Sequence, residues 1–252
     1  ERASDAVPPL RKAFALAAKE NADPSAVIQT AGSVLPDELL FPLLDEVANQ
    51  DQGRAVALSA ARLYLARGNR EEAIQRLEEL RTELPPDHGM RQTVLMTLGG
   101  AYQTVGKLEE ARKVLQEAVE RQPENVAALN DLAYLLADEL GKGKDAIPLA
   151  EKAVRLAKDG SVLEAYCLDT LGLAQFLDGQ LREAEQSLRR AIAIHDLPAI
   201  RIHMARVAWA MGKNEDAKMH LDRARELAES AKDDSSLKEI EQLSAKLSEE
   251  PE

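Results

Sequence analysis

Hydrophobic residues recur along this chain at the spacing of helix faces, and the whole pattern returns every 33 to 39 residues. In the segment from Gln92 to Asn125 the recurring positions are Gly99, Tyr102, Gly106, Ala111, Leu115, Ala118 and Pro123. Apolar residues three or four positions apart form one face of an α-helix, and a glycine in the left-handed conformation commonly ends one. The segment therefore predicts two helices joined by a turn at Gly106, with small residues where the helices approach closely.

Five copies of this pattern occupy residues 54–230 and start near Arg54, Gln92, Val126, Ala165 and Pro198. We attribute the longer intervals between copies to extended connections at 86–89, 140–143 and 158–162. A helical pair that repeats at this length cannot bury its apolar face alone and stacks on its neighbours. The pattern predicts an all-α array of antiparallel hairpins.

The flanking segments fit the pattern less well. Residues 1–53 contain three shorter helical stretches, at 8–20, 23–31 and 36–48. We interpret them as degenerate repeats; the alternative is the trailing end of a longer array. Residues 231–248 carry one apolar stripe, formed by Leu237, Ile240, Leu243 and Leu247. A stripe of this kind predicts a helix that caps the last repeat. The tail at 249–252 is predicted to be disordered.

The repeated positions resemble those of the tetratricopeptide repeat family, in its bacterial form. The resemblance covers residues 54–229 and implies a right-handed superhelical α-solenoid of antiparallel hairpins. The stretches Asn130–Ala137 and Leu168–Gly172 are also similar to repeats in tetratricopeptide proteins linked to exopolysaccharide export and envelope assembly. Some relatives clamp a terminal carboxylate with basic and amide side chains, but the matching positions here hold Leu58, Arg62, Met96 and Gly100. That clamp is missing.

The resemblance also implies a concave groove, lined by fixed positions on the first helix of each hairpin. Carried over to this sequence, the expected groove residues are Arg62, Met96, Gln103, Asn130, Tyr134, Asp138, Tyr166, Asp169, Leu173, Phe176, Ile202, Arg206 and Trp209. Four of the chain's eight aromatic residues fall in this set, and large aromatics anchor interfaces. The groove is therefore expected to bind an apolar peptide or an amphipathic helix. The alternative is that these rings pack between neighbouring helices.

Composition narrows the possible partners. The net charge of −12 argues against a general nucleic-acid binder, because phosphate backbones repel acidic surfaces. No apolar stretch reaches the roughly 20 residues that a membrane-spanning helix needs. The single cysteine, Cys167, excludes an internal disulfide. The compartment stays open between cytoplasm and periplasm, because the chain begins at Glu1 and an export signal or anchor upstream of it is compatible with the sequence.

No pattern in the sequence predicts catalysis, a cofactor or a metal site. The four histidines at 88, 195, 203 and 220 lack the spacing of metal ligands on one helix. The acid pairs Glu71-Glu72 and Glu109-Glu110 begin second helices, where carboxylates favour the positive helix end. The run 141–144 has the glycines and lysines of a phosphate loop without its full fingerprint, so we interpret it as a turn. Cys167 is interpreted as a small semi-buried hydrophobe.

Two functions suit such a chain. The first is a non-catalytic scaffold or adaptor that holds a peptide or helix of a partner protein in its groove. The second is a structural role, either as a spacer or as a self-associating homo-oligomer within a longer envelope or exopolysaccharide-export protein. The sequence does not identify the partner.

Overall fold

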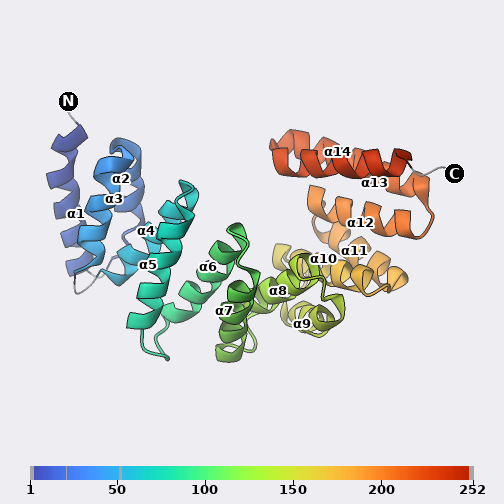
Figure 1. Ribbon diagram of the computed structural model, residues 1–252, viewed down its shortest axis with the longest axis horizontal. Helices are drawn as coiled ribbons and strands as arrows, with labels where there is room; N and C mark the ends of the chain where they lie inside the picture. The colour runs from blue at the N-terminus through green and yellow to red at the C-terminus, as the bar shows by residue number, and fades with distance from the viewer. Residues whose placement is uncertain (1–2, 21, 51–52, 250–252) are drawn as a thin grey trace. The chain divides into compact units, whose positions relative to one another are not determined.

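The computed structural model describes residues 3–20, 22–50 and 53–249, and these residues form helices and turns with no strand (Figure 1). The all-α fold of antiparallel hairpins predicted from the repeat pattern is confirmed. The chain divides into two compact units, the first up to Ala118 and the second from Val119, and this division falls within α7.

The first unit holds the N-terminal helices and the first repeats. Its elements are η1 (Ala3–Ala6), α1 (Val7–Lys19), α2 (Ser25–Val34), α3 (Asp37–Ala48), α4 (Arg54–Ala66), α5 (Arg70–Glu83), α6 (Met90–Thr104) and most of α7 (Leu108–Arg121). The helices α1 to α3 match the three predicted stretches, although α2 continues to Val34. Phe14 and the leucines of α3 form their common core with Val56 and Ala60 of α4.

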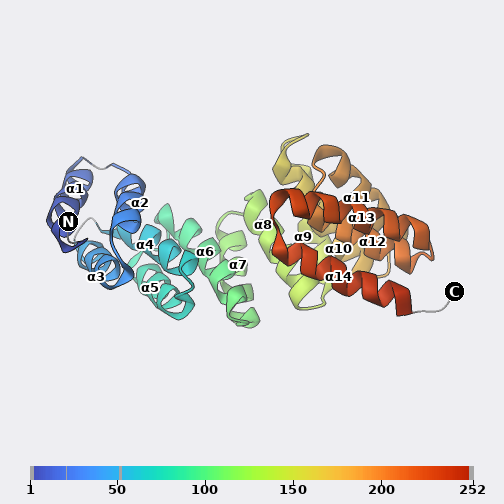
Figure 2. The same cartoon turned by 90° about the horizontal axis from the view of Figure 1, so that it is seen from above.

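The second unit contains three complete hairpins and a final helix. Its elements are α8 (Val126–Tyr134), η2 (Leu135–Glu139), α9 (Gly143–Leu156), α10 (Val162–Leu177), α11 (Leu181–Ile194), α12 (Pro198–Ala210), α13 (Asn214–Ala231) and α14 (Asp234–Glu249). Within this unit the helices pack in chain order, each hairpin against the next (Figures 1 and 2). The first helices α8, α10 and α12 therefore lie next to one another.

The repeat interval is constant in the structure. The first helices begin at residues 54, 90, 126, 162 and 198, so each starts 36 residues after the last. Two sequence-based starts, near Gln92 and Ala165, were therefore a few residues late. The extra residues lie at the beginning of α6 and α10, which have 15 and 16 residues where α4 and α12 have 13. The uneven intervals inferred from the sequence are therefore not explained by longer connections alone. A repeat with a longer first helix has a shorter connection to the next repeat, so the interval stays constant.

Each hairpin turns through three residues, and the middle one is a glycine with a positive φ between 62° and 83°. Side chains rarely adopt this conformation, so these glycines end the first helices as the sequence predicts. Gly99 has a different role. A Cβ at Gly99 would lie 2.6 Å from Leu115 Cγ, and the same is true of Gly172 and Leu188. Glycine at these two positions lets the second helix of the hairpin pack directly on the first.

The last helix takes the place of a sixth first helix. α14 begins at Asp234, again 36 residues after the start of α12. Ile240 and Leu243 of α14 are buried with Ile202 of α12 and with Leu221 and Ala224 of α13. α14 thus covers the apolar side that the fifth hairpin would otherwise expose, as expected of a capping helix. Of the predicted disordered tail, Glu249 ends α14 and residues 250–252 lie outside the described part of the chain.

Candidate functional site

The first helices of the second unit present one continuous face, built from α8 with η2, α10 and α12. α10 packs against both α8 and α12, so side chains from the three helices are neighbours. We call this surface the first-helix face. It carries ten of the thirteen predicted groove residues within one described unit, together with α14 at its end.

α10 is the central helix of this face. Eleven of its 16 residues are buried, because α8, α9, α11 and α12 all contact it. The exceptions are its last residues, where Leu177 is 44 % exposed, and its beginning, where Val162 is 47 %, Leu163 is 38 % and Tyr166 is 45 % exposed. Ser161 fixes the first turn, since its Oγ accepts a hydrogen bond from the Glu164 backbone N–H at 3.1 Å. We call the side chains of Val162, Leu163 and Tyr166 the apolar patch.

Next to α10, the end of α8 carries a tyrosine and two acids. Tyr134 is half-buried, and its hydroxyl donates a hydrogen bond to Asp138 Oδ2 at 2.8 Å. Burial and the nearby Asp138 carboxylate raise the pKa of Tyr134, so its hydroxyl stays protonated. Asp138 and Glu139 are exposed and lie in η2, a π-helical turn that continues α8. Such wide turns often occur at functional sites.

A buried ion pair joins α10 to α12. Asp169 Oδ1 lies 2.7 Å from His203 Nδ1, and both side chains are about nine-tenths buried. Burial lowers the pKa of His203, but the adjacent Asp169 carboxylate raises it by more, so the net shift is upward. On the next turn of α12, Arg206 donates to Glu239 of α14 at 2.5 Å. These polar pairs hold the three helices in register.

The structure divides the predicted groove residues by accessibility. In the second unit Tyr166 and Asp138 are exposed, whereas Asn130, Tyr134, Phe176, Arg206 and Trp209 are half-buried. Asp169, Leu173 and Ile202 are buried, at 7 %, 1 % and 0 % exposure. Ile202 is covered by α13 and α14, so its side chain contributes to the core instead of to an accessible surface. Phe176 and Trp209 likewise pack partly against core clusters.

The other three predicted residues belong to the first unit. Arg62 is exposed and lines a shallow groove between α2 and α4, with Ile28, Gly32 and Leu63. In the same groove Arg67 donates to the Gly32 carbonyl at 3.0 Å and pairs with Asp37 at 3.3 Å. Met96 and Gln103 are half-buried on α6.

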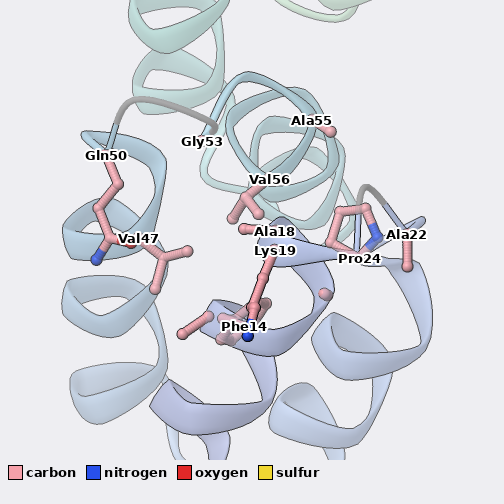
Figure 3. Close-up of a pocket in the computed structure, with 12 residues that line it drawn as sticks. Phe14, Ala18, Lys19, Ala22, Pro24, Val47, Gln50, Gly53, Ala55 and Val56 are labelled. Carbon is pink, nitrogen blue, oxygen red and sulfur yellow. The ribbon is translucent and has the colours of Figure 1, made fainter.

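A separate hollow of about 430 Å³ lies among the ends of α1 to α4 (Figure 3). Phe14, Val47, Pro24 and Val56 form much of its wall, and Lys19 is its one charged side chain among the described residues. An amine without an acid or a second base beside it provides no pair for acid–base chemistry. The described residues that line the hollow therefore supply no acid–base pair.

The residues considered for chemistry occupy structural positions. Cys167 is buried, and burial raises its thiol pKa to about 12, so almost no reactive thiolate forms near neutral pH. Gly141 is the turn glycine of its hairpin, and a Cβ at Gly143 would lie 2.6 Å from the Ala174 carbonyl oxygen. The start of α9 is thus packed against the end of α10, as expected of a turn.

The described residues offer neither a cluster of metal ligands nor a helix suited to cross a membrane. No three His, Cys, Asp or Glu side chains in them gather closely enough to hold a metal ion. None of their helices combines the length and apolar character that a membrane crossing requires.

Sequence reasoning missed Val162, Leu163 and Glu139 as members of the face. Val162 and Leu163 precede Ala165, where the sequence placed the start of this repeat. Two adjacent large apolar residues before that start were the signal that the helix begins earlier. For His203 the sequence indicates only that it lacks the spacing of a metal ligand on one helix. Nothing within its own repeat indicates that it meets Asp169, which is 34 residues away.

Comparison with known sequences points to one family. Residues 96–161 match the family model for the tetratricopeptide repeat. A TPR repeat-containing protein from Pseudomonas aeruginosa is 28 % identical over 151 residues, which is 59 % of this chain. The chain spans only 24 % of that relative's length.

Comparison with solved structures gives the same fold. A thermophilic TPR protein from Thermus thermophilus superposes with a TM-score of 0.60 at 22 % identity, covering 75 % of this chain and 97 % of the other. MamA from Desulfovibrio magneticus gives a TM-score of 0.58 at 22 % identity, covering 70 % and 96 %. At this identity the likeness concerns the fold alone.

Proposed function

Because this chain is a tetratricopeptide repeat protein, we propose that it is a non-catalytic scaffold that binds a segment of a partner protein on its first-helix face. Tetratricopeptide arrays generally serve as protein–protein interaction scaffolds. The proposal places the contact on α8, η2, α10 and α12 of the second unit. The bound segment is a peptide or a helix.

The observation that carries the proposal is the apolar patch. Val162 and Tyr166 are one helical turn apart, and Leu163 lies three residues before Tyr166, so the three side chains are neighbours on α10. They are exposed on a helix of which eleven of the 16 residues are buried. Covering large apolar side chains stabilises a complex by about 25 cal/mol per Å². Tyrosine also supplies a hydroxyl for hydrogen bonding at an interface.

The chain offers a matched control for this patch. Met219 is 55 % exposed, which is more than any member of the patch, but it lies on α13, a second helix. Substituting Met219 removes exposed apolar surface from the same unit without touching the first-helix face. An effect of patch variants that the Met219 variant does not share is therefore specific to the face.

The test is a quantitative pull-down from a lysate of the source organism with three baits: the unaltered chain, Leu163→Ser/Tyr166→Ala, and Met219→Ser. Circular dichroism first establishes that both variants are folded. We expect a partner that the unaltered chain and Met219→Ser capture equally, and that the patch variant captures at least about tenfold less, as the loss of an interface anchor predicts. Equal capture by all three baits would place the interaction elsewhere.

Self-association is tested with the same proteins. Light scattering coupled to size-exclusion chromatography reports the mass of each one over a range of concentrations. We expect one concentration-independent mass shared by all three proteins. A larger mass for the unaltered chain that Leu163→Ser/Tyr166→Ala loses would identify the occupant of the patch as a second copy of the chain.

A further inference from the structure

We propose that the partner segment bound on the first-helix face is cationic, with lysine or arginine side chains beside the apolar residues that cover the patch. This inference rests on the proposed function and adds the chemistry of the partner. It is carried by the distribution of charge over the first two hairpins of the second unit.

Charge in the first two hairpins of this unit is segregated by helix. The third hairpin does not share this division, because α12 carries Arg201 and Arg206, and α13 holds five acidic and three basic residues. The first helices α8 with η2 and α10 hold five acidic residues and neither lysine nor arginine: Asp131, Asp138, Glu139, Glu164 and Asp169. The second helices that pack behind them, α9 and α11, hold six basic residues against four acidic ones: Lys144, Lys152, Arg155, Arg182, Arg189 and Arg190 are the bases. Solubility alone does not require this division, because mixed charges on both sides would serve equally well.

The cations of α12 do not neutralise the face. Arg201 pairs with Asp196 at 2.6 Å, and Arg206 pairs with Glu239 at 2.5 Å. His203 is buried against Asp169. Each cationic group on α12 is thus matched by an acid of this unit, and none remains to offset the carboxylates of α8 and η2.

Three of the five acids of the face are not used in ion pairs among the described residues. Glu164 pairs with Arg190, and Asp169 pairs with His203. Asp138 accepts only the neutral Tyr134 hydroxyl, and Glu139 is exposed beside it. Asp131 is partly buried, and burial raises its pKa, so a cation placed next to it would favour its ionised form.

The aromatic side chains of the face suit the same partner. Tyr134 and Tyr166 lie on the two acid-only helices, and the face of a tyrosine ring attracts a lysine or arginine placed over it. A basic segment with an apolar residue would pair with Asp138 and Glu139 while covering Leu163 and Tyr166. An acidic segment would meet unpaired carboxylates, which electrostatic complementarity disfavours.

The experiment uses a random peptide library displayed on phage, selected against the whole chain and, in parallel, against Tyr134→Ala/Tyr166→Ala. We expect the selected peptides to be enriched in lysine and arginine and to depend on the two tyrosines. A selected peptide is then synthesised and its Kd measured at low and high salt. For Asp138→Asn/Glu139→Gln we expect binding about threefold to tenfold weaker, from two exposed ion pairs, with a smaller salt dependence.

The control variant is Glu183→Gln/Asp222→Asn, which removes the same charge from exposed positions on α11 and α13. We expect it to change the Kd less than about twofold, because exposed charges far from the ligand are screened. Selected peptides that are neutral or acidic, but still require the tyrosines, would overturn the inference that the partner segment is cationic. They would leave the proposed function intact. Peptides that bind regardless of the tyrosines, or a selection that yields none, would contradict both.

Discussion

Two adjacent glycines of α6, Gly99 and Gly100, differ in whether the packing leaves room for a larger side chain. Gly99 faces Leu115, and the space for a Cβ is already filled by that leucine side chain. Gly100, the next residue in α6, has no heavy atom within 4 Å of the position of a Cβ. Neither glycine has a positive φ, so neither is required by its backbone conformation. The first glycine is required by packing, whereas the second only adds flexibility to the unfolded chain.

This contrast predicts opposite effects of one substitution. Gly100→Ala should stabilise the chain by about 0.5–1 kcal/mol, because alanine loses less entropy in a helix. Gly99→Ala gains the same propensity but forces Leu115 to move, which costs about 1–3 kcal/mol, so we expect a net loss. Urea denaturation followed by circular dichroism measures both variants. Stabilisation by Gly99→Ala would show that Leu115 relaxes freely.

Between elements, polar contacts add specificity to apolar packing. Small apolar residues fill the interface within each hairpin, and Ala184, Leu188 and Ala191 of α11 are all buried. Between α10 and α12 a charged pair is buried instead, and between α12 and α14 Arg206 reaches Glu239. A buried charge that loses its partner is strongly destabilising, so these pairs disfavour any shift of one helix along the next.

The Asp169–His203 pair predicts a pH dependence of stability. Because the pKa of His203 is raised above its unfolded value, its contribution is complete below the unfolded pKa near 6.5 and is lost as the pH rises through the folded value. The free energy of unfolding should therefore fall between pH 6 and pH 9 by more in the unaltered chain than in Asp169→Asn. Asp138→Asn, which changes an exposed carboxylate, should leave that slope unchanged.

Urea denaturation at both pH values, followed by Trp209 fluorescence, measures the difference. Equal slopes for the unaltered chain and Asp169→Asn would show that the pair is not ionic.

Across the whole molecule, stability is distributed along the chain. In a stacked array each hairpin contacts only its neighbours, so the stability of the folded chain is approximately the sum of contributions from single repeats and from the interfaces between neighbouring repeats. The first unit begins with three short helices of 13, 10 and 12 residues, and α3 contains Pro42. The second unit ends in the longer helices α13 and α14, of 18 and 16 residues, which enclose a shared apolar core.

Unequal units predict that the chain does not unfold in one step. Trp209 is the single tryptophan and lies in the second unit, so its fluorescence reports that unit alone. Circular dichroism reports the helices of both units. We expect part of the helical signal to be lost at lower urea concentration than the change in Trp209 fluorescence, as non-coincident transitions require. Coincident curves from the two probes would show that the chain unfolds cooperatively as a whole.

The helices, the hairpin turns and the family could all be predicted from the sequence. They follow from local properties: glycines that end helices, small residues at fixed spacing and apolar stripes are visible without knowing what lies beside them. Which side chains stay accessible emerged only from the packing of the helices. Ile202 has the position of a groove residue but is covered by α14, whereas Val162 and Leu163 precede the recognised pattern and are exposed. Exposure depends on the neighbouring helix, and so does the meeting of Asp169 with His203 across α10 and α12. Such contacts depend on how successive hairpins pack, which the residues of a single repeat do not specify.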